Sequence, residues 1–179
     1  MGSFKVVFVA RHVQLAKTEG VGYDDRPISS AGIEQARALR GFASLNGVSI
    51  VVTSTLRRAV RTGRMIADGS SLSLVASPLL NEIDPSEADA SVQSRLYKVL
   101  SSRWRANALL VSHGGFLSRL IRLVGMPFVE SPADMIDRHG SLLDYGQIVP
   151  LSLPAAIGAL GWKERDALPH GHVSQGHVF

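Results

Sequence analysis

The sequence contains no cysteine, which excludes a disulfide, a cysteine nucleophile and a thiolate metal site. It also has no apolar run long enough to cross a bilayer. The first apolar segment, residues 4–10, is not preceded by the basic stretch that begins a secretory signal. We therefore expect a cytoplasmic protein that makes no use of a membrane.

Lysine-rich tracts and alternation of aromatic with basic residues are missing as well, although the formal net charge is +4. Nucleic acid is therefore not an expected partner, and an anionic small substrate would explain the same basic balance. No helical segment carries a His-x-x-x-His pair, so we expect neither a metal nor another cofactor. The sequence leaves the oligomeric state open, a dimer being one alternative.

The 179 residues, of which 45% are hydrophobic and 19% charged, fit one globular domain. Short apolar or β-branched runs predict five strands, at 4–10, 48–53, 72–76, 108–112 and 142–153. Helical periodicity predicts a helix capped by Ser30, followed by helices over 55–68, 88–103 and 115–124.

This alternation predicts an α/β fold: a single-domain three-layer sandwich with a mostly parallel sheet and helices on both faces. We place the catalytic domain at residues 1–167. Residues 168–179 are rich in glycine and histidine, and we favour a flexible tail there over a metal-binding tract.

Polar side chains gather where the predicted strands end. In an open α/β sheet, ligands bind at the carboxyl ends of the strands. Polar residues at a single strand end are explained equally well by a strand that ends there and exposes them to water. Four strand ends here carry histidine, arginine, serine or carboxylate groups, namely Arg11, His12, Ser54, Arg58, Glu82, Asp84 and His113.

These residue types point to phosphate chemistry. Arginine binds phosphate oxygens in a fork and stays charged, and the N-terminus of the helix predicted after Gly114 and Gly115 adds backbone N–H donors. Histidine near pH 7 is either a neutral nucleophile or a charged donor. One histidine could attack phosphorus and the other donate to an equatorial oxygen, while a carboxylic acid protonates the leaving oxygen.

The same residues resemble the histidine phosphatase superfamily, the phosphoglycerate-mutase-like group. Five segments carry the resemblance in the family's order: ARH at 10–12, DRPISSAGIEQARALR at 25–40, TSTLRRAVRT at 53–62, LLNEID at 79–84 and VSHGG at 111–115. The resemblance implies a phosphoglycerate-mutase-like fold. It also implies a reaction through a phosphohistidine, without metal.

By this resemblance, His12 is the nucleophile and Glu82 the proton donor, with Asp84 as a rival acid. The substrate-binding groups implied are Arg11, Arg58, Ser54, His113 and Gly114. We expect Arg57 to face outward or to lie at the substrate rim. Arg61 and Arg64 would lie on a solvated face, and His139 in an exposed loop.

Val13 departs from the family, which usually has glycine after the nucleophile. A β-branched side chain there would narrow the pocket or shift the following loop. The departure also supports an alternative of another class, a non-catalytic module that binds phosphate. Against that alternative, both histidines, both arginines and the acid are present.

Only one predicted helix, 88–103, fits between Glu82 and His113. The mutases of this group have a long insertion there that closes the site, so we favour hydrolysis over phosphoryl transfer between substrate positions. Glu82 suits an alkoxide leaving group, which favours a small-molecule phosphate over protein phosphohistidine. Substrate selection would come from residues 14–25, 81–88 and 127–141.

Overall fold

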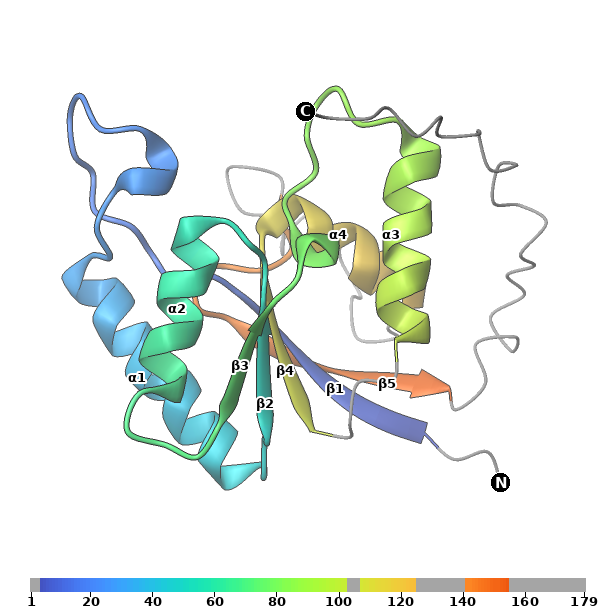
Figure 1. Cartoon of the computed structure of the whole chain (residues 1–179), viewed down its shortest axis with the longest axis horizontal. Coiled ribbons are helices and arrows are strands. Elements are labelled where there is room, and N and C mark those ends of the chain that lie inside the picture. Colours follow the sequence, from blue (N-terminus) through green and yellow to red (C-terminus); the bar gives the residue numbers. More distant parts are fainter. Residues whose placement is uncertain (1–3, 103–106, 125–140, 155–179) are drawn as a thin grey trace, which may run out of the picture.

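A computed structural model describes residues 4–102, 107–124 and 141–154. These residues form a five-stranded sheet in the order β3-β2-β4-β1-β5 (Figure 1). The strands are β1 (Phe4–Arg11), β2 (Ile50–Thr53), β3 (Ser73–Ala76), β4 (Ala108–Ser112) and β5 (Ile148–Pro154). The first four are parallel and β5 is antiparallel to β1, which confirms the mostly parallel α/β sheet.

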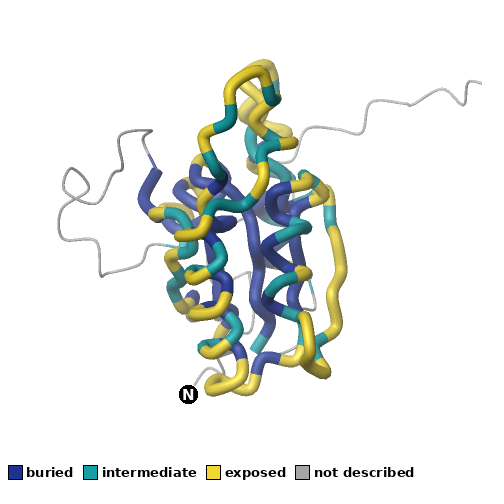
Figure 2. Tube along the Cα trace, turned by 90° about the vertical axis from the view of Figure 1, so that its left-hand side faces the viewer, coloured by how far each residue is buried: buried dark blue, intermediate teal, exposed yellow. Residues whose placement is uncertain are grey.

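Helices cover both faces of the sheet. They are α1 (Ser30–Leu45), α2 (Arg57–Ala67), α3 (Asp89–Ser101) and α4 (Gly114–Val124), with short 3₁₀ turns η1 (Tyr23–Asp25) and η2 (Pro78–Leu80). Two hydrophobic clusters result, one under α3 and α4 and the other under α1 and α2. In Figure 2 the buried strands lie between helices whose outer sides are exposed.

Side chains of β1 alternate between the two clusters because neighbouring residues of a strand face opposite sides of a sheet. Val7 and Val9 join the cluster under α3 and α4, whereas Phe8 and Ala10 join the other. A strand buried on both faces is apolar throughout. The apolar run at residues 6–10 therefore reflects the position of β1 inside the sheet, between β4 and β5.

The predicted last strand, 142–153, is wrong at its beginning. β5 starts at Ile148, and residues 141–147 form a turn segment in which Gly146 has a φ of +69°. Leu142 and Leu143 are buried in the core without being in a strand, and the backbone N–H of Leu142 donates to Ser118 Oγ at 2.9 Å. Their apolar character reflects burial in the core. A sequence pattern cannot distinguish such burial from membership of a strand.

The helices shift by a residue or two from their predicted limits. Ser29, and not Ser30, caps α1, because its Oγ accepts the backbone N–H of Gly32 at 3.0 Å. Thr55 precedes α2, with its backbone N–H and its hydroxyl both donating to Asn81 Oδ1. No helix within the described ranges is long and apolar enough to span a membrane. His139, residues 155–167 and the predicted tail at 168–179 lie outside these ranges.

Candidate active site

The carboxyl ends of β1, β2 and β4 bring the predicted site residues together. The register pairs Arg11 with Ser112, and Thr53 with Val111. Sheet-like hydrogen bonds continue one residue further: His12 N–H donates to Ser112 O, and Ser54 N–H donates to Val111 O, both at 2.9 Å. Among the buried polar residues of this region are the predicted site residues Arg11, His12, Ser54, Arg58 and His113.

His12 is held in one neutral form. Its Nδ1 lies 2.9 Å from the carbonyl oxygen of Val13, and a carbonyl can only accept, so Nδ1 carries the hydrogen. The lone pair is then on Nε2. Burial lowers the pKa of His12 to about 3, against the hydrogen bond to Val13, and the charges of Arg58 and Arg11 lower it further. His12 is therefore uncharged at neutral pH.

His113 has the opposite tautomer. Arg58 Nε donates to His113 Nδ1 at 3.1 Å, and since arginine has no acceptor, the ring hydrogen is on Nε2. Nε2 donates to Ser54 Oγ at 2.8 Å, and Ser54 Oγ donates to Asn81 Oδ1 at 2.9 Å. Burial, followed by the charges of His12 and Arg58, lowers the pKa of His113 to about 2. Its ring centroid is 5.3 Å from that of His12.

The two arginines approach His12 from different elements. Arg58, in the first turn of α2, is oriented on one side by His113 and on the other by Asp24, whose Oδ1 is 2.9 Å from Arg58 Nη1. Arg11 Nη1 donates to Leu143 O at 2.8 Å. The turn segment before β5 thus helps to fix Arg11, although the sequence pattern predicted a strand there.

Val13 does not occupy the polar site. Its side chain is fully buried in the hydrophobic cluster under α1 and α2, and its backbone N–H donates to Thr62 Oγ1 at 3.2 Å. Among the described residues, Asn107 is the only non-glycine residue with a positive φ, so Val13 takes no conformation that needs glycine. The expectation that Val13 narrows the pocket is therefore wrong.

Glu82 contacts the N-terminus of α4, the helix that begins directly after His113. Its Oε1 accepts from the backbone N–H of Phe116 at 2.9 Å and of Ile83 at 3.0 Å, and its Oε2 accepts from Gly115 at 3.3 Å. A Cβ on Gly115 would lie 2.8 Å from Glu82 Oε1, so glycine there makes room for the carboxylate. Asp84, the rival acid, is exposed and hydrogen-bonded to Ser86, which lowers its pKa.

Three residues that the sequence did not single out also line this region. The rings of Tyr23 and Tyr145 lie 6.4 and 5.4 Å from the ring of His12, and their hydroxyls are 2.9 Å apart. Asp24 contacts Arg58. No motif marks these positions: Tyr23 and Asp24 fall within residues 14–25, which were expected to select the substrate, and Tyr145 falls within the predicted strand 142–153.

The arginines further along α2 differ in their surroundings. Arg57 is exposed and pairs with Asp25, as expected for an outward-facing residue. Arg61 is half-buried and donates to the carbonyl oxygens of Asp25 and Arg26 at 3.3 and 2.9 Å, so it is less exposed than Arg57 and binds the backbone of the η1 segment. Arg64 is exposed, as expected.

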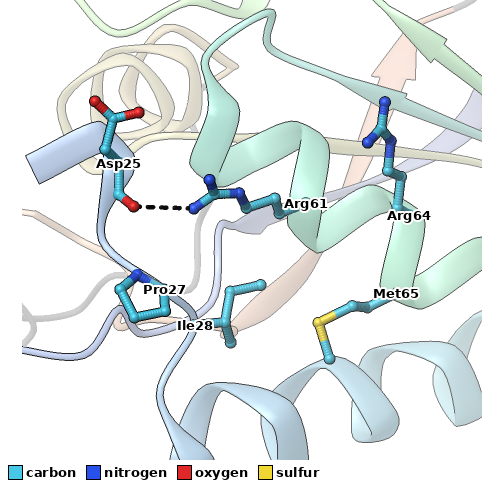
Figure 3. Close-up of a pocket in the computed structure, with 6 residues that line it drawn as sticks. All are labelled: Asp25, Pro27, Ile28, Arg61, Arg64 and Met65. Carbon is cyan, nitrogen blue, oxygen red and sulfur yellow. Dashed lines mark hydrogen bonds between the residues drawn. The ribbon is translucent and has the colours of Figure 1, made fainter.

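A separate hollow of about 440 Å³ is lined by the segment 25–28 and by α2. Figure 3 shows Arg61 donating to the backbone of Asp25 at its edge. Its lining residues are Asp25, Pro27, Ile28, Arg61, Arg64 and Met65, none of which belongs to the histidine site. Within the described part of the chain, no three His, Asp or Glu side chains are grouped so that they could hold a metal ion.

Comparison with known proteins finds related sequences and structures. Residues 7–97 match the family model of the histidine phosphatase superfamily (branch 1). The probable phosphoglycerate mutase GpmB of Yersinia enterocolitica is 28% identical over 144 residues, which are 77% of this chain and 61% of that protein. This chain thus spans about three-fifths of the length of that relative.

Solved structures show the same fold. A protein of Escherichia coli that is proposed to be an alpha-ribazole-5'-P phosphatase superposes with a TM-score of 0.62 at 24% identity, covering 82% of this chain and 89% of that one. YhfR of Bacillus stearothermophilus has a TM-score of 0.62 at 16% identity, with coverages of 86% and 96%. At these identities the likeness establishes the fold.

Proposed function

Because this chain belongs to the histidine phosphatase superfamily, we propose that it is a histidine-type phosphatase that hydrolyses a small phosphate monoester through a phosphohistidine on His12. The observation that carries the proposal is the state of His12. It is buried and neutral, and the bond from Nδ1 to Val13 O leaves the Nε2 lone pair for attack.

In the first step, Nε2 of His12 attacks phosphorus, and the bond between phosphorus and the ester oxygen breaks. The imidazole gains positive charge, and its Nδ1–H continues to donate a hydrogen bond to the carbonyl oxygen of Val13. Arg58 and Arg11 balance the charge on the equatorial oxygens of the phosphoryl group. The leaving alkoxide takes a proton from the carboxylic acid of Glu82.

In the second step, water attacks the phosphohistidine, the phosphorus–nitrogen bond breaks, and inorganic phosphate leaves. Glu82, now a carboxylate, accepts the proton from that water, which restores the enzyme. Every group in this cycle comes from the chain itself, so the proposed reaction needs no metal.

Hydrolysis is favoured over a mutase reaction because only 30 residues separate Glu82 from His113, and α3 and β4 both lie within them. A mutase must protect its phosphoenzyme from water while the substrate reorients. The GpmB relative carries the name of a mutase, but this chain spans only part of its length. We therefore assign the chain a phosphatase reaction.

One observation supports a second candidate, a phosphatase that acts on protein phosphohistidine. Glu82 accepts three backbone hydrogen bonds, which hold its carboxyl against the N-terminus of α4 and its own loop. An imidazole leaving group needs less help from an acid than an alkoxide does. Glu82 would then serve mainly to begin α4.

The proposal is tested with p-nitrophenyl phosphate in the presence of EDTA, using wild type, His12→Ala and the exposed-site control Arg64→Ala. Samples are quenched in alkaline denaturant, because phosphohistidine is labile in acid, and are weighed by mass spectrometry. We expect turnover and a phosphoryl adduct in wild type and Arg64→Ala, and neither in His12→Ala. Folded wild-type protein that binds vanadate without turnover would instead favour the non-catalytic module.

Glu82→Gln separates the two substrate classes. If Glu82 is the acid, kcat/KM for an alkyl phosphate should fall about 100-fold or more, while p-nitrophenyl phosphate, with its good leaving group, should lose less than about threefold. An unchanged rate on alkyl phosphate, together with faster hydrolysis of a phosphohistidine peptide, would overturn the small-molecule assignment.

A further inference from the structure

The turn η1 places a carboxylate on donors that suit a phosphate. Asp24 Oδ1 accepts from Arg58 Nη1 at 2.9 Å and from the Arg58 backbone N–H at 3.3 Å, and Asp24 Oδ2 accepts from the Arg57 backbone N–H at 3.1 Å. Two of these donors are the first N–H groups of α2. A guanidinium beside a helix N-terminus is a typical anion-binding combination.

The other contacts of Arg58 tie these donors to the histidine site. Its Nε is bound to His113, whose ring is 5.3 Å from that of His12, and its side chain is only 10% exposed. The negative charge of Asp24 also acts on His12. Burial opposes ionisation of Asp24, but the hydrogen bonds from Arg58 and Arg57 outweigh it and lower the pKa. Asp24 is therefore an anion at neutral pH.

The rest of the turn is fastened elsewhere. Tyr23 is hydrogen-bonded to Tyr145, and both of their rings lie near that of His12. Arg61 donates to the carbonyl oxygens of Asp25 and Arg26. Asp24 is 35% exposed, so its carboxylate can move toward solvent while these contacts remain. Its bond to Arg58 is thus separable from the fold of the turn.

We propose that Asp24 is an internal competitor for the phosphoryl group, and so a residue that sets the affinity of the site for substrate. In the free protein its carboxylate occupies Arg58 Nη1 and the N-terminus of α2. A bound phosphate takes these donors, and Asp24 must leave. Displacing Asp24 costs free energy for every ligand. Only an anion that binds these donors more strongly than a carboxylate is therefore retained. The inference rests on the proposed phosphate site but not on turnover.

The test measures binding of inorganic phosphate by calorimetry to the full chain, in wild type, Asp24→Asn and Asp25→Asn. Asp25 is a matched control because it lies in the same turn and pairs with Arg57, not with Arg58. We expect Asp24→Asn to bind phosphate about tenfold more tightly or better, since a like charge near the ligand is removed. Asp25→Asn should stay within about threefold of wild type, as is usual for exposed ion pairs. Arg58→Ala should lose the binding.

Unchanged or weaker phosphate binding by folded Asp24→Asn would overturn the inference, as would binding that survives Arg58→Ala. If Asp24→Asn does not fold, the ¹³C signal of the Asp24 carboxyl in wild type provides the test. It should shift when phosphate is added, and a constant signal at saturation would contradict displacement. Tighter phosphate binding without turnover would refute the phosphatase proposal alone, whereas turnover with no effect of Asp24 would refute this inference alone.

Discussion

Replacing Val13 with glycine restores the residue that the family usually has after the nucleophile, yet the structure predicts a loss rather than a gain. The isopropyl group of Val13 is fully buried among apolar side chains under α1 and α2. Its backbone carbonyl accepts from Nδ1 of His12, and its backbone N–H donates to Thr62 Oγ1. The side chain therefore contributes to stability, and the backbone contributes to the site.

The magnitude follows from the carbons removed. Val13→Gly deletes three buried carbon groups, worth about 2.4 kcal/mol at roughly 0.8 kcal/mol each. The added backbone freedom of glycine costs about 0.5–1 kcal/mol more. The free energy of unfolding should therefore fall by about 3–4 kcal/mol, with the upper value expected if the cavity does not close. Val13→Ala should lose about 2 kcal/mol, which separates packing from backbone freedom.

Urea unfolding measures the stability, and kcat/KM on p-nitrophenyl phosphate measures the site. A looser peptide at position 13 holds Nδ1 of His12 less firmly, so we expect kcat/KM to fall by up to about tenfold. Val13→Ala, which keeps the backbone restricted, should stay close to wild type in kcat/KM. A Val13→Gly protein that is as stable as wild type and faster would refute this account of Val13.

Further predictions concern the arginine and the two histidines. Arg58→Lys keeps the charge but cannot bond His113 and an anion with one planar fork, so kcat/KM should fall about 100-fold, and a loss below about fivefold would mean that charge alone suffices. Because the pKa of His12 is about 3, its NMR signals should not titrate between pH 8 and 5, and a transition near pH 6.5 would contradict its burial. Both histidine pKa values are lowered on folding, so the unfolded chain binds protons first as pH falls below about 6.5. Stability should then decrease by about 1 kcal/mol per pH unit for each histidine, and His113→Asn should show the smaller slope in urea unfolding.

Much of this site could be predicted from the sequence because its residues follow short β-forming runs. Parallel strands bring their carboxyl ends to one edge, so Arg11, His12, Ser54 and His113 had to lie near one another. The helical pattern after Ser54 likewise placed Arg58 in a first turn. These inferences depend on local periodicity and topology, which the sequence records directly.

Other features depend on tertiary contacts that no local pattern records. Leu142 and Leu143 look like strand residues because they are buried, but they belong to the turn segment that binds Arg11. The direction of the Val13 side chain follows from where α1 and α2 pack. The position of Asp24 follows from a turn that folds back onto α2. No periodicity in the sequence predicts that turn.

The role of His12 as nucleophile can be tested by locating the phosphoryl group on the trapped phosphoenzyme. Protein labelled with ¹⁵N on histidine is mixed with p-nitrophenyl phosphate in EDTA, and the phosphorylated ring is identified by ³¹P and ¹⁵N NMR. Because Nδ1 of His12 donates to Val13 O, we expect one phosphoryl group, on Nε2 of His12. A phosphoryl group on Nδ1 or on His113, or turnover with no phosphohistidine under rapid quench, would contradict it.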